Sequence, residues 1–221
     1  MFTLNFVEYI IHLLKDPRSA IAGAIATGPL FAYGFVFLIV FIETAVVFFP
    51  FLPGDSLLFA AGFFAADGGF NIIVLLALVW IAAIVGDQCN FMIGHFFGRK
   101  IVESGKVKAM TPEHIQKSEA FLEKWGHLAI FLGRFFPFIR TFVPFIAGMG
   151  GMHWRSFVIY NILGGITWST IFILLGYFFG GIPFVQQHFE FLIIGIVLVS
   201  LVPTAVGILR SYLNKKKVSQ E

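Results

Sequence analysis

Apolar residues run through this chain in long blocks, and polar residues interrupt them at only a few points. The blocks at residues 71–97, 157–179 and 191–209 are each long enough to cross a hydrocarbon core of about 30 Å as a helix, at about 1.5 Å per residue. Residues 4–14 place apolar side chains at helical spacing, which predicts a short helix in the membrane interface. The pattern therefore predicts an all-α membrane protein.

Two further apolar blocks contain helix-breaking residues. The first runs over residues 30–49 and resumes at residues 56–66, a second part of only eleven residues that is too short to cross the bilayer. The break between these parts consists of Pro50, Pro53, Gly54 and Asp55. The second block, residues 127–148, is broken by Pro137 and Pro144. We expect both blocks to enter the membrane and return as re-entrant hairpins, although residues 30–49 could also form a full span.

The two broken blocks resemble each other in sequence, and so do the spans that follow them. The matching pairs are residues 48–52 and 135–139, residues 61–62 and 147–148, and residues 94–98 and 176–180. Each unit would contain one hairpin and one crossing, and an odd number of crossings inverts the second copy. Inverted repeats are common in secondary transporters, whose broken helices meet near the midplane. Coincidence in a chain with 30 Phe and 23 Gly is the alternative.

The composition indicates that the bilayer is the solvent. The chain is 58% hydrophobic and 12% charged, with a mean hydropathy of +0.90, whereas soluble domains carry about 25% charged residues. The net charge of +3 comes without a basic stripe, so a nucleic-acid partner is not expected. Cys89 is the only cysteine, which excludes an internal disulfide and a thiolate metal site. We expect neither a metal nor a cofactor, and residues 1–15 lack the pattern of a cleavable signal peptide.

The distribution of Lys and Arg orients the chain. The positive-inside rule places the C-terminal tail, which contains Lys215, in the cytoplasm. The polar stretch at residues 101–126, where we expect a helix from about 111 to 125 with Pro112 as its first residue, lies on the same side if the second block is re-entrant. The expected organisation is an interfacial segment at 1–29, one transporter domain at 30–210 and a basic tail at 211–221. Within the domain we expect two repeats, at about 30–98 and 127–180. A cytoplasmic loop at 99–126 separates the repeats, and a final span at 191–209 follows them. The side of the N-terminus and self-association into a homo-oligomer stay open.

The two broken blocks carry opposite charges. Glu43 and Asp55 belong to the first block, and Arg134 and Arg140 belong to the second. A charge at the centre of a span costs about 2.5–3.5 kcal/mol, so all four need partners or water. Arginine binds phosphate through a bidentate fork, and a carboxylate in a cavity can load and release a proton. The four charges could instead form ion pairs that only hold the hairpins together, and Asp87 could either bond to a neighbouring helix or join a proton path.

Three stretches of the chain together resemble the bacterial DedA family, and the resemblance extends over about residues 30–210. They are the string Phe-Leu-Pro-Gly-Asp at residues 51–55, which follows Glu43, and residues 133–141 and 144–148. The resemblance implies a bacterial inner-membrane protein with two opposed re-entrant hairpins, linked to proton-coupled transport and to the flipping of undecaprenyl phosphate. The acidic and basic positions that matter in that family match Glu43, Asp55, Arg134 and Arg140. We expect the arginines to bind phosphate and the two carboxylates to couple protons, with Pro53, Gly54, Asp87, Pro137 and Pro144 as accessory residues.

The expected function is that of a flippase that returns undecaprenyl phosphate, a polyprenyl phosphate, to the cytoplasmic leaflet. A proton-coupled exporter of small ions or cationic drugs is the alternative, with the carboxylates holding the cargo. An intramembrane enzyme is less expected, because the chain has neither a His-Glu-x-x-His zinc pair nor a Gly-x-Ser-x-Gly nucleophile elbow. A scaffold, the remaining class, predicts that the buried charges can be neutralised without loss of function.

Overall fold

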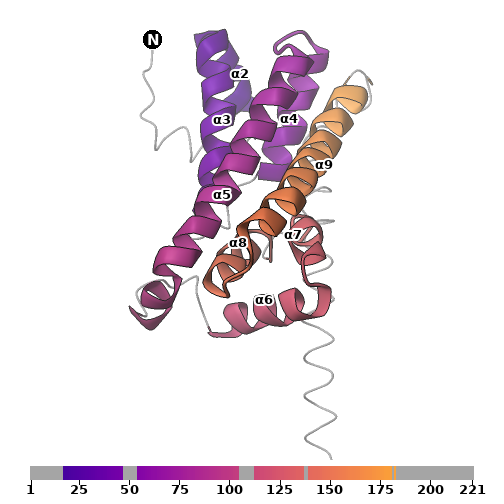
Figure 1. Cartoon of the computed structure of the whole chain (residues 1–221). Coiled ribbons are helices and arrows are strands. Elements are labelled where there is room, and N and C mark those ends of the chain that lie inside the picture. Colours follow the sequence, from indigo (N-terminus) through magenta and orange to yellow (C-terminus); the bar gives the residue numbers. More distant parts are fainter. Residues whose placement is uncertain (1–16, 47–53, 105–111, 137–138, 181, 183–221) are drawn as a thin grey trace, which may run out of the picture.

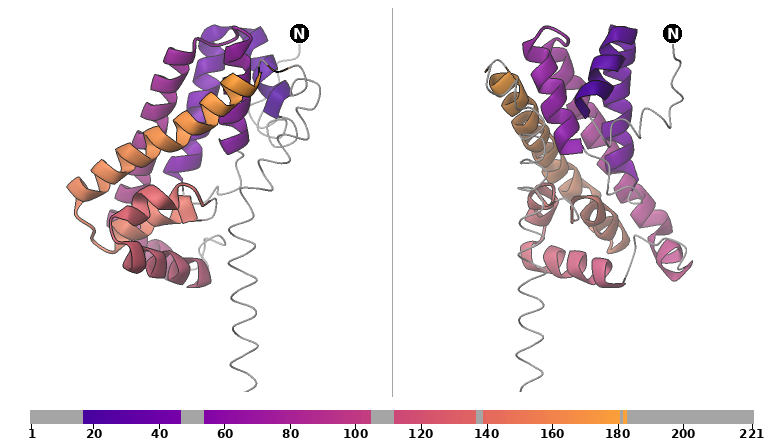
Figure 2. Two further views of the ribbon diagram at one scale, coloured as in Figure 1. Left: turned by 90° about the vertical axis from the view of Figure 1, so that its right-hand side faces the viewer. Right: turned by 180° about the vertical axis from the view of Figure 1, so that it is seen from behind.

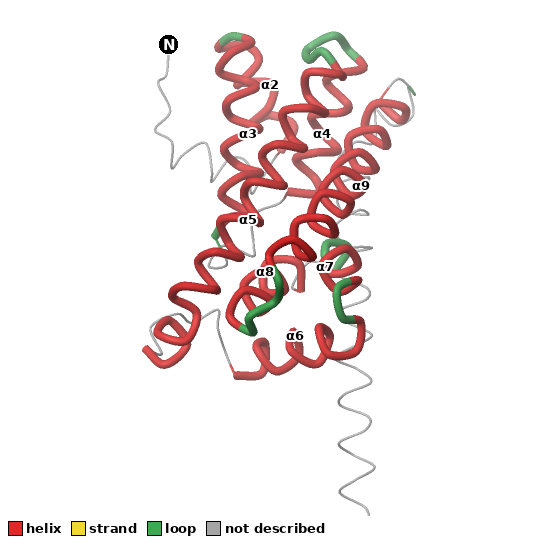
Figure 3. The backbone as a smooth tube through the Cα atoms, in the orientation of Figure 1, coloured by secondary structure: helices red, strands yellow, loops and turns green. Residues whose placement is uncertain are grey.

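A computed structural model describes residues 17–46, 54–104, 112–136, 139–180 and 182. The elements in these residues are α-helices (Figures 1 and 3). They are α2 (Pro17–Thr27), α3 (Pro29–Ala45), α4 (Gly54–Ala66), α5 (Ile72–Ser104), α6 (Pro112–Trp125), α7 (Leu128–Gly133), α8 (Ile139–Met149) and α9 (Trp154–Gly180). The interfacial helix expected at 4–14, the span at 191–209, the basic tail, Pro50, Pro53 and Pro137 lie outside the described residues.

The two long apolar helices form the spans that the sequence predicts. Residues Ile72–Gly98 of α5 and all of α9 are long and apolar enough to cross a membrane. Their outer faces present large apolar side chains, such as Ile73 at 74% exposure and Phe178 at 69%, as lipid-facing surfaces do. One boundary differs from expectation, because α5 continues through Arg99 and Lys100 to Ser104. These charges end the apolar span but not the helix, since Arg and Lys are good helix formers.

Between and beside the spans lie short helices. Helices α4 and α8 have 13 and 11 residues, or about 20 and 17 Å at the usual rise, which is less than a bilayer core. Pro144, expected to break the second block, lies inside α8 instead. A helix near a membrane interior tolerates proline when its surroundings satisfy the freed carbonyl. The interruption falls earlier, where α7 ends at Gly133 and Arg134 follows as its C-cap.

Helix α6 begins at Pro112 and ends at Trp125, which confirms the helix expected in the polar segment. It packs across α7 and α8, at the end of the bundle opposite the α4–α5 connection (Figures 1 and 2). Helix α2 was not predicted, because its stretch of small residues has little amphipathic pattern. Its residues Ala20, Ile21 and Ala24 are nevertheless buried in the same core as α3 and α4.

The short helices are exchanged between the two spans. Helix α4, which precedes α5 in the chain, packs along α9, and α8, which precedes α9, packs along α5. Glycines permit this close approach. A methyl group on Gly62 of α4 would overlap the carbonyl oxygen of Ile173, and one on Gly148 of α8 would overlap that of Phe91.

Two apolar clusters enclose a polar layer. The larger one joins α2, α3 and α4 to the first half of α5 and the second half of α9. The smaller one includes Phe91 of α5 and Phe157 of α9, whose stacked rings lie 4.3 Å apart. Between the clusters lie Asp87 and Asn90 of α5 and Asn161 of α9, and all three are buried. Asp87 lies near the middle of the apolar part of α5, and Asn161 lies in the first third of α9.

Candidate functional site

The ends of the short helices converge on this polar layer. Glu43 lies in the last turn of α3, and Asp55 is the second residue of α4. Arg134 follows α7, and Arg140 is the second residue of α8. The structure brings together the four charged residues that the sequence singled out, and it places Asp87, which was expected as an accessory residue, beside Arg134.

Arg140 joins the two broken segments through two carboxylates. Its Nη1 donates to Asp55 Oδ1 at 2.7 Å, and its Nη2 pairs with Glu43 Oε1. The backbone N–H of Gly54 also donates to Glu43 Oε1, at 3.2 Å. A methyl group on Gly54 would overlap the Glu43 carboxylate, so a larger residue here would push that carboxylate out of its present position. We call Arg140, Glu43, Asp55 and Gly54 the Arg140 cluster.

Arg134 has different partners. Its Nη2 pairs with Asp87 Oδ2 and also donates to Asn161 Oδ1 at 2.5 Å. The same nitrogen lies 3.4 Å from the Ala83 carbonyl oxygen, and Asn161 Nδ2 donates to the Ile84 carbonyl oxygen at 3.0 Å. The side chains of the ion pair are each 4% exposed. We call Arg134, Asp87 and Asn161 the Arg134 cluster.

Two glycines of α9 leave room for the Arg134 side chain. A methyl group on Gly164 would lie 2.9 Å from Arg134 Cδ, and one on Gly165 would lie 3.4 Å from Arg134 Nη2. Sequence reasoning missed both glycines and Asn161. Glycine is common in membrane helices, so the only available signal was that an Asn and a Gly-Gly pair lie on one span.

Trp168 lies between the two clusters and was also missed as a site residue. The Arg140 guanidinium carbon lies 5.2 Å from the centre of the indole ring, and that of Arg134 lies 6.0 Å away. The indole Nε1–H donates to Asp55 Oδ1 at 2.9 Å. The ring is buried, with 2% of the residue exposed. Its sequence context did not separate it from a tryptophan that only packs between helices.

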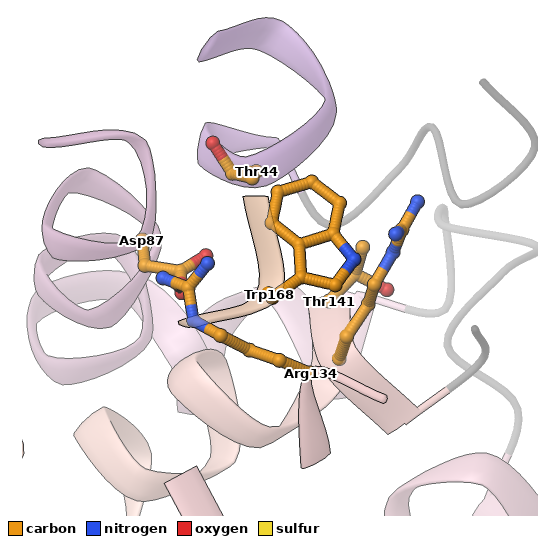
Figure 4. Close-up of a pocket in the computed structure, with 6 residues that line it drawn as sticks. Thr44, Asp87, Arg134, Thr141 and Trp168 are labelled. Carbon is orange, nitrogen blue, oxygen red and sulfur yellow. Dashed lines mark hydrogen bonds and ion pairs between the residues drawn. The ribbon is translucent and has the colours of Figure 1, made fainter. Parts of the chain in front are cut away.

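A small cavity of about 10 Å³ separates these groups. It is lined by Thr44, Asp87, Arg134, Arg140, Thr141 and Trp168. Figure 4 shows Arg134 reaching toward Asp87, with Thr44, Thr141 and Trp168 around the space. The volume is about that of one water. Five buried side-chain atoms have no hydrogen-bond partner among the described residues, and three of them belong to residues that form or line the site: Glu43 Oε2, Arg134 Nε and Thr141 Oγ1. The site therefore has unused polar capacity but no room for a larger ligand in this conformation.

Asn90 connects the site to the span α5. Its Nδ2 donates to the carbonyl oxygen of Thr44 at 3.2 Å and to that of Thr141 at 2.8 Å. The first carbonyl belongs to the last turn of α3, where helix carbonyls lack intrahelical partners. Asn90 thus links α3 and α8 to the span α5.

The site contains more acidic than basic groups. Three carboxylates, those of Glu43, Asp55 and Asp87, contact two guanidinium groups. When all are ionised, the described site carries one formal negative charge in excess. In the described part of the chain, no group of three or more His, Cys, Asp or Glu side chains could hold a metal ion.

These features define a helical membrane protein with paired charges buried halfway along its spans. Residues 52–178 match the VTT domain, and the chain belongs to this family, which includes DedA proteins. The chain is 42% identical to Protein DedA of Escherichia coli (strain K12) over 209 residues, covering 94% of this chain and 95% of that protein. It is 39% identical to a membrane protein of Mycobacterium tuberculosis (strain ATCC 25618 / H37Rv) over 84% of this chain and 82% of the other. It is 32% identical to Inner membrane protein YghB of Escherichia coli (strain K12) over 71% of each chain. No solved structure is significantly similar to it.

Proposed function

We propose that this protein is a transporter that carries an anionic lipid phosphate across the bacterial inner membrane. Its substrate is undecaprenyl phosphate, which it returns to the cytoplasmic leaflet in a proton-coupled cycle. The observation that carries the proposal is the buried layer in which Arg134 and Arg140 are held by carboxylates midway along the spans. Structural ion pairs are weak stabilisers relative to apolar packing, so a role in recognition accounts better for their presence.

The chemistry of exchange links phosphate to protons. A phosphate oxygen can take the place of a carboxylate oxygen on a guanidinium. Because carboxylates already exceed guanidiniums in the site, a further anion would be repelled unless a carboxylate took up a proton or moved away. The N-termini of α4 and α8 open toward the same layer, and their partial positive charges favour an anion.

We further propose that the fold is an inverted repeat of two opposed re-entrant hairpins, with the C-terminus in the cytoplasm. The glycine contacts support this. In one matching pair of contacts, Gly62 lies against Ile173 and Gly148 lies against Phe91. In the other pair, a methyl group on Gly176 would overlap the Phe59 carbonyl, and a methyl group on Gly94 would overlap the Phe145 carbonyl. Each contact has its counterpart at the matching position of the other copy. The short helices α4 and α8 would then be the returning halves of the hairpins.

Transport in proteoliposomes tests the function. We expect a fluorescent polyprenyl phosphate to cross between leaflets faster with the protein than without it, and faster still under a pH gradient. Arg134→Lys and Arg140→Lys should each lose most of the activity, because an ammonium cannot reproduce the guanidinium fork. Arg155→Lys, at an exposed position near the start of α9, is the matched control. Full activity in both site variants would contradict the assignment of the arginines.

The excess of carboxylates also favours a second candidate, a proton-coupled exporter of small cations or cationic drugs. In that case a cationic cargo would replace a guanidinium on Glu43 or Asp55. The same vesicles distinguish the two functions. A cation exporter would move a labelled cation against a pH gradient and leave the lipid phosphate where it is. Release of inorganic phosphate from the lipid would instead indicate an enzyme.

A further inference from the structure

The position of Trp168 deepens the proposed function, on which this inference rests. The indole lies within cation–π distance of both guanidinium groups, at 5.2 and 6.0 Å. A phosphate held by both arginines would have to lie in the space between them. That space contains the ring and a cavity with room for about one water. The arginines cannot share one phosphate while the ring stays where it is.

The ring is also well suited to this place. The face of an indole carries negative electrostatic potential, so it attracts the two guanidinium cations beside it. It can therefore stand in for an anion between Arg134 and Arg140 while no substrate is bound. Its N–H is fixed by Asp55, which accepts from Arg140 through the same oxygen, Oδ1. Trp168 thus contacts both arginines and one carboxylate of the site.

We propose that Trp168 occupies the phosphate position of the empty transporter and is displaced when a lipid phosphate binds. The bound phosphate takes over the two guanidinium contacts that the ring makes, and the Asp55 hydrogen bond breaks as the ring leaves. Trp168 is then a specificity residue, because only a ligand that binds guanidinium more strongly than the ring does can open the site. A neutral lipid of the same length cannot.

Simple packing predicts a different result. A buried tryptophan that only fills space stabilises whatever state surrounds it, and its removal weakens ligand binding or leaves it unchanged. A ring that competes with the ligand has the opposite effect, because its removal clears the space between the two arginines. The sign of the change in affinity therefore separates the two roles.

The first experiment uses Trp168 as a reporter. A variant with Trp80→Phe, Trp125→Phe and Trp154→Phe retains only this tryptophan. Farnesyl phosphate in detergent micelles should change its emission to saturation and increase its quenching by acrylamide, because the ring leaves its buried position. Farnesol is the control and should do neither. Calorimetry with the wild-type protein measures farnesyl phosphate binding independently.

The outcomes separate this inference from the proposed function. If calorimetry detects no binding of farnesyl phosphate, the proposed function fails and the inference fails with it. If calorimetry shows saturable binding while Trp168 stays protected from acrylamide, the inference alone is overturned.

The second experiment measures whether removal of the Trp168 ring raises or lowers the affinity for farnesyl phosphate. We expect Trp168→Ala to bind farnesyl phosphate about tenfold more tightly than wild type, since the competing cation–π contacts are gone. Trp168→Phe keeps a ring but loses the N–H to Asp55, so we expect about threefold tighter binding. Trp80→Phe, on the first span, is the control and should not change the affinity. If Trp168→Ala does not fold, Trp168→Phe still gives the sign. Weaker or unchanged binding in the folded variants would overturn the proposal.

Discussion

The two arginines of the site come from either side of one short break, yet they are held in different ways. Arg134 makes its side-chain bonds through a single nitrogen, to Asp87 and Asn161, and glycines surround its stem. Arg140 uses both terminal nitrogens, one for each carboxylate of the first broken segment. The Arg134 cluster connects the second broken segment to the spans α5 and α9, whereas the Arg140 cluster connects the two broken segments to each other.

This difference in partners suggests different roles for the two arginine clusters. The Arg134 cluster has balanced charges, and its partners sit on long helices that packing holds in place. The Arg140 cluster has an excess carboxylate, and its partners sit near the ends of α3 and α4, where few helical bonds would have to break. We infer that Arg134 mainly anchors its segment and that proton-linked exchange takes place around Arg140.

The largest expected effect is on proton coupling. We expect Glu43→Gln to keep the shape of the side chain but to remove the stimulation of transport by a pH gradient. Asp55→Asn should instead impair substrate affinity or folding, because Arg140 and the Trp168 N–H both bond to this carboxylate. Asp87→Asn should slow transport but retain its dependence on the gradient. Transport by vesicles across a pH series measures all three.

Asp67→Asn is the control for these variants, because Asp67 is an exposed carboxylate after α4. Two results would break the comparison between the clusters. A double Glu43→Gln, Asp55→Asn variant with the wild-type rate and pH profile would make these carboxylates purely structural. Loss of gradient dependence in Asp87→Asn alone would move the proton-coupled step to the Arg134 cluster.

The next effect concerns stability. Arg134→Met leaves Asp87 buried without its cation, at a cost of about 3–5 kcal/mol. Adding Asp87→Leu removes that charge, and we expect most of the loss to be recovered. Arg140→Met should cost a similar amount, but adding Asp55→Leu should recover little, because Glu43 stays buried and unpaired. Thermal unfolding in detergent measures these differences. Equal recovery in both pairs would mean that Glu43 is neutral at that pH.

How much of this could be predicted from sequence depends on the kind of signal. The spans and the charged residues were visible, since an ion in apolar sequence is conspicuous at any position. The pairing of Arg134 with Asp87 was not, because it depends on how α7 lies against α5. Trp168, Asn161 and the Gly164–Gly165 pair were missed for a related reason. These residue types are common in membrane helices, and only their three-dimensional neighbours distinguish them.

A smaller effect tests whether the packing of α4 on α9 and the packing of α8 on α5 are equivalent. Gly94→Ala and Gly176→Ala would each place a methyl group against a backbone carbonyl, that of Phe145 or Phe59. A carbonyl in a helix cannot move aside as a side chain can, so we expect each variant to lose about 1–3 kcal/mol. The two losses should be similar, because the added methyl group would lie 2.1 Å from one carbonyl oxygen and 2.0 Å from the other. Gly34→Ala, with open space around it, should lose nothing. Unequal losses would mean that the helix packing around the two clusters is also asymmetric.

The smallest effect compares one substitution at two tryptophans. Trp80 donates to the Thr170 hydroxyl at 2.9 Å, and Trp168 donates to the Asp55 carboxylate at the same distance. A hydrogen bond to a neutral group contributes about 0.5–1.5 kcal/mol and one to a charged group about 1.5–3 kcal/mol. Trp168→Phe should therefore destabilise the empty protein by about 1 kcal/mol more than Trp80→Phe does.

The two bonds should also respond differently to the charge on Asp55. In an Asp55→Asn background the acceptor is neutral, and the difference between the two tryptophan variants should shrink toward zero. Unfolding midpoints of the four variants and their parents in detergent provide the measurement. If the difference persists in that background, it arises from the deeper burial of Trp168 rather than from its bond to the carboxylate. Trp168 would then support the Arg140 cluster through packing alone, as Gly164 and Gly165 support the Arg134 cluster.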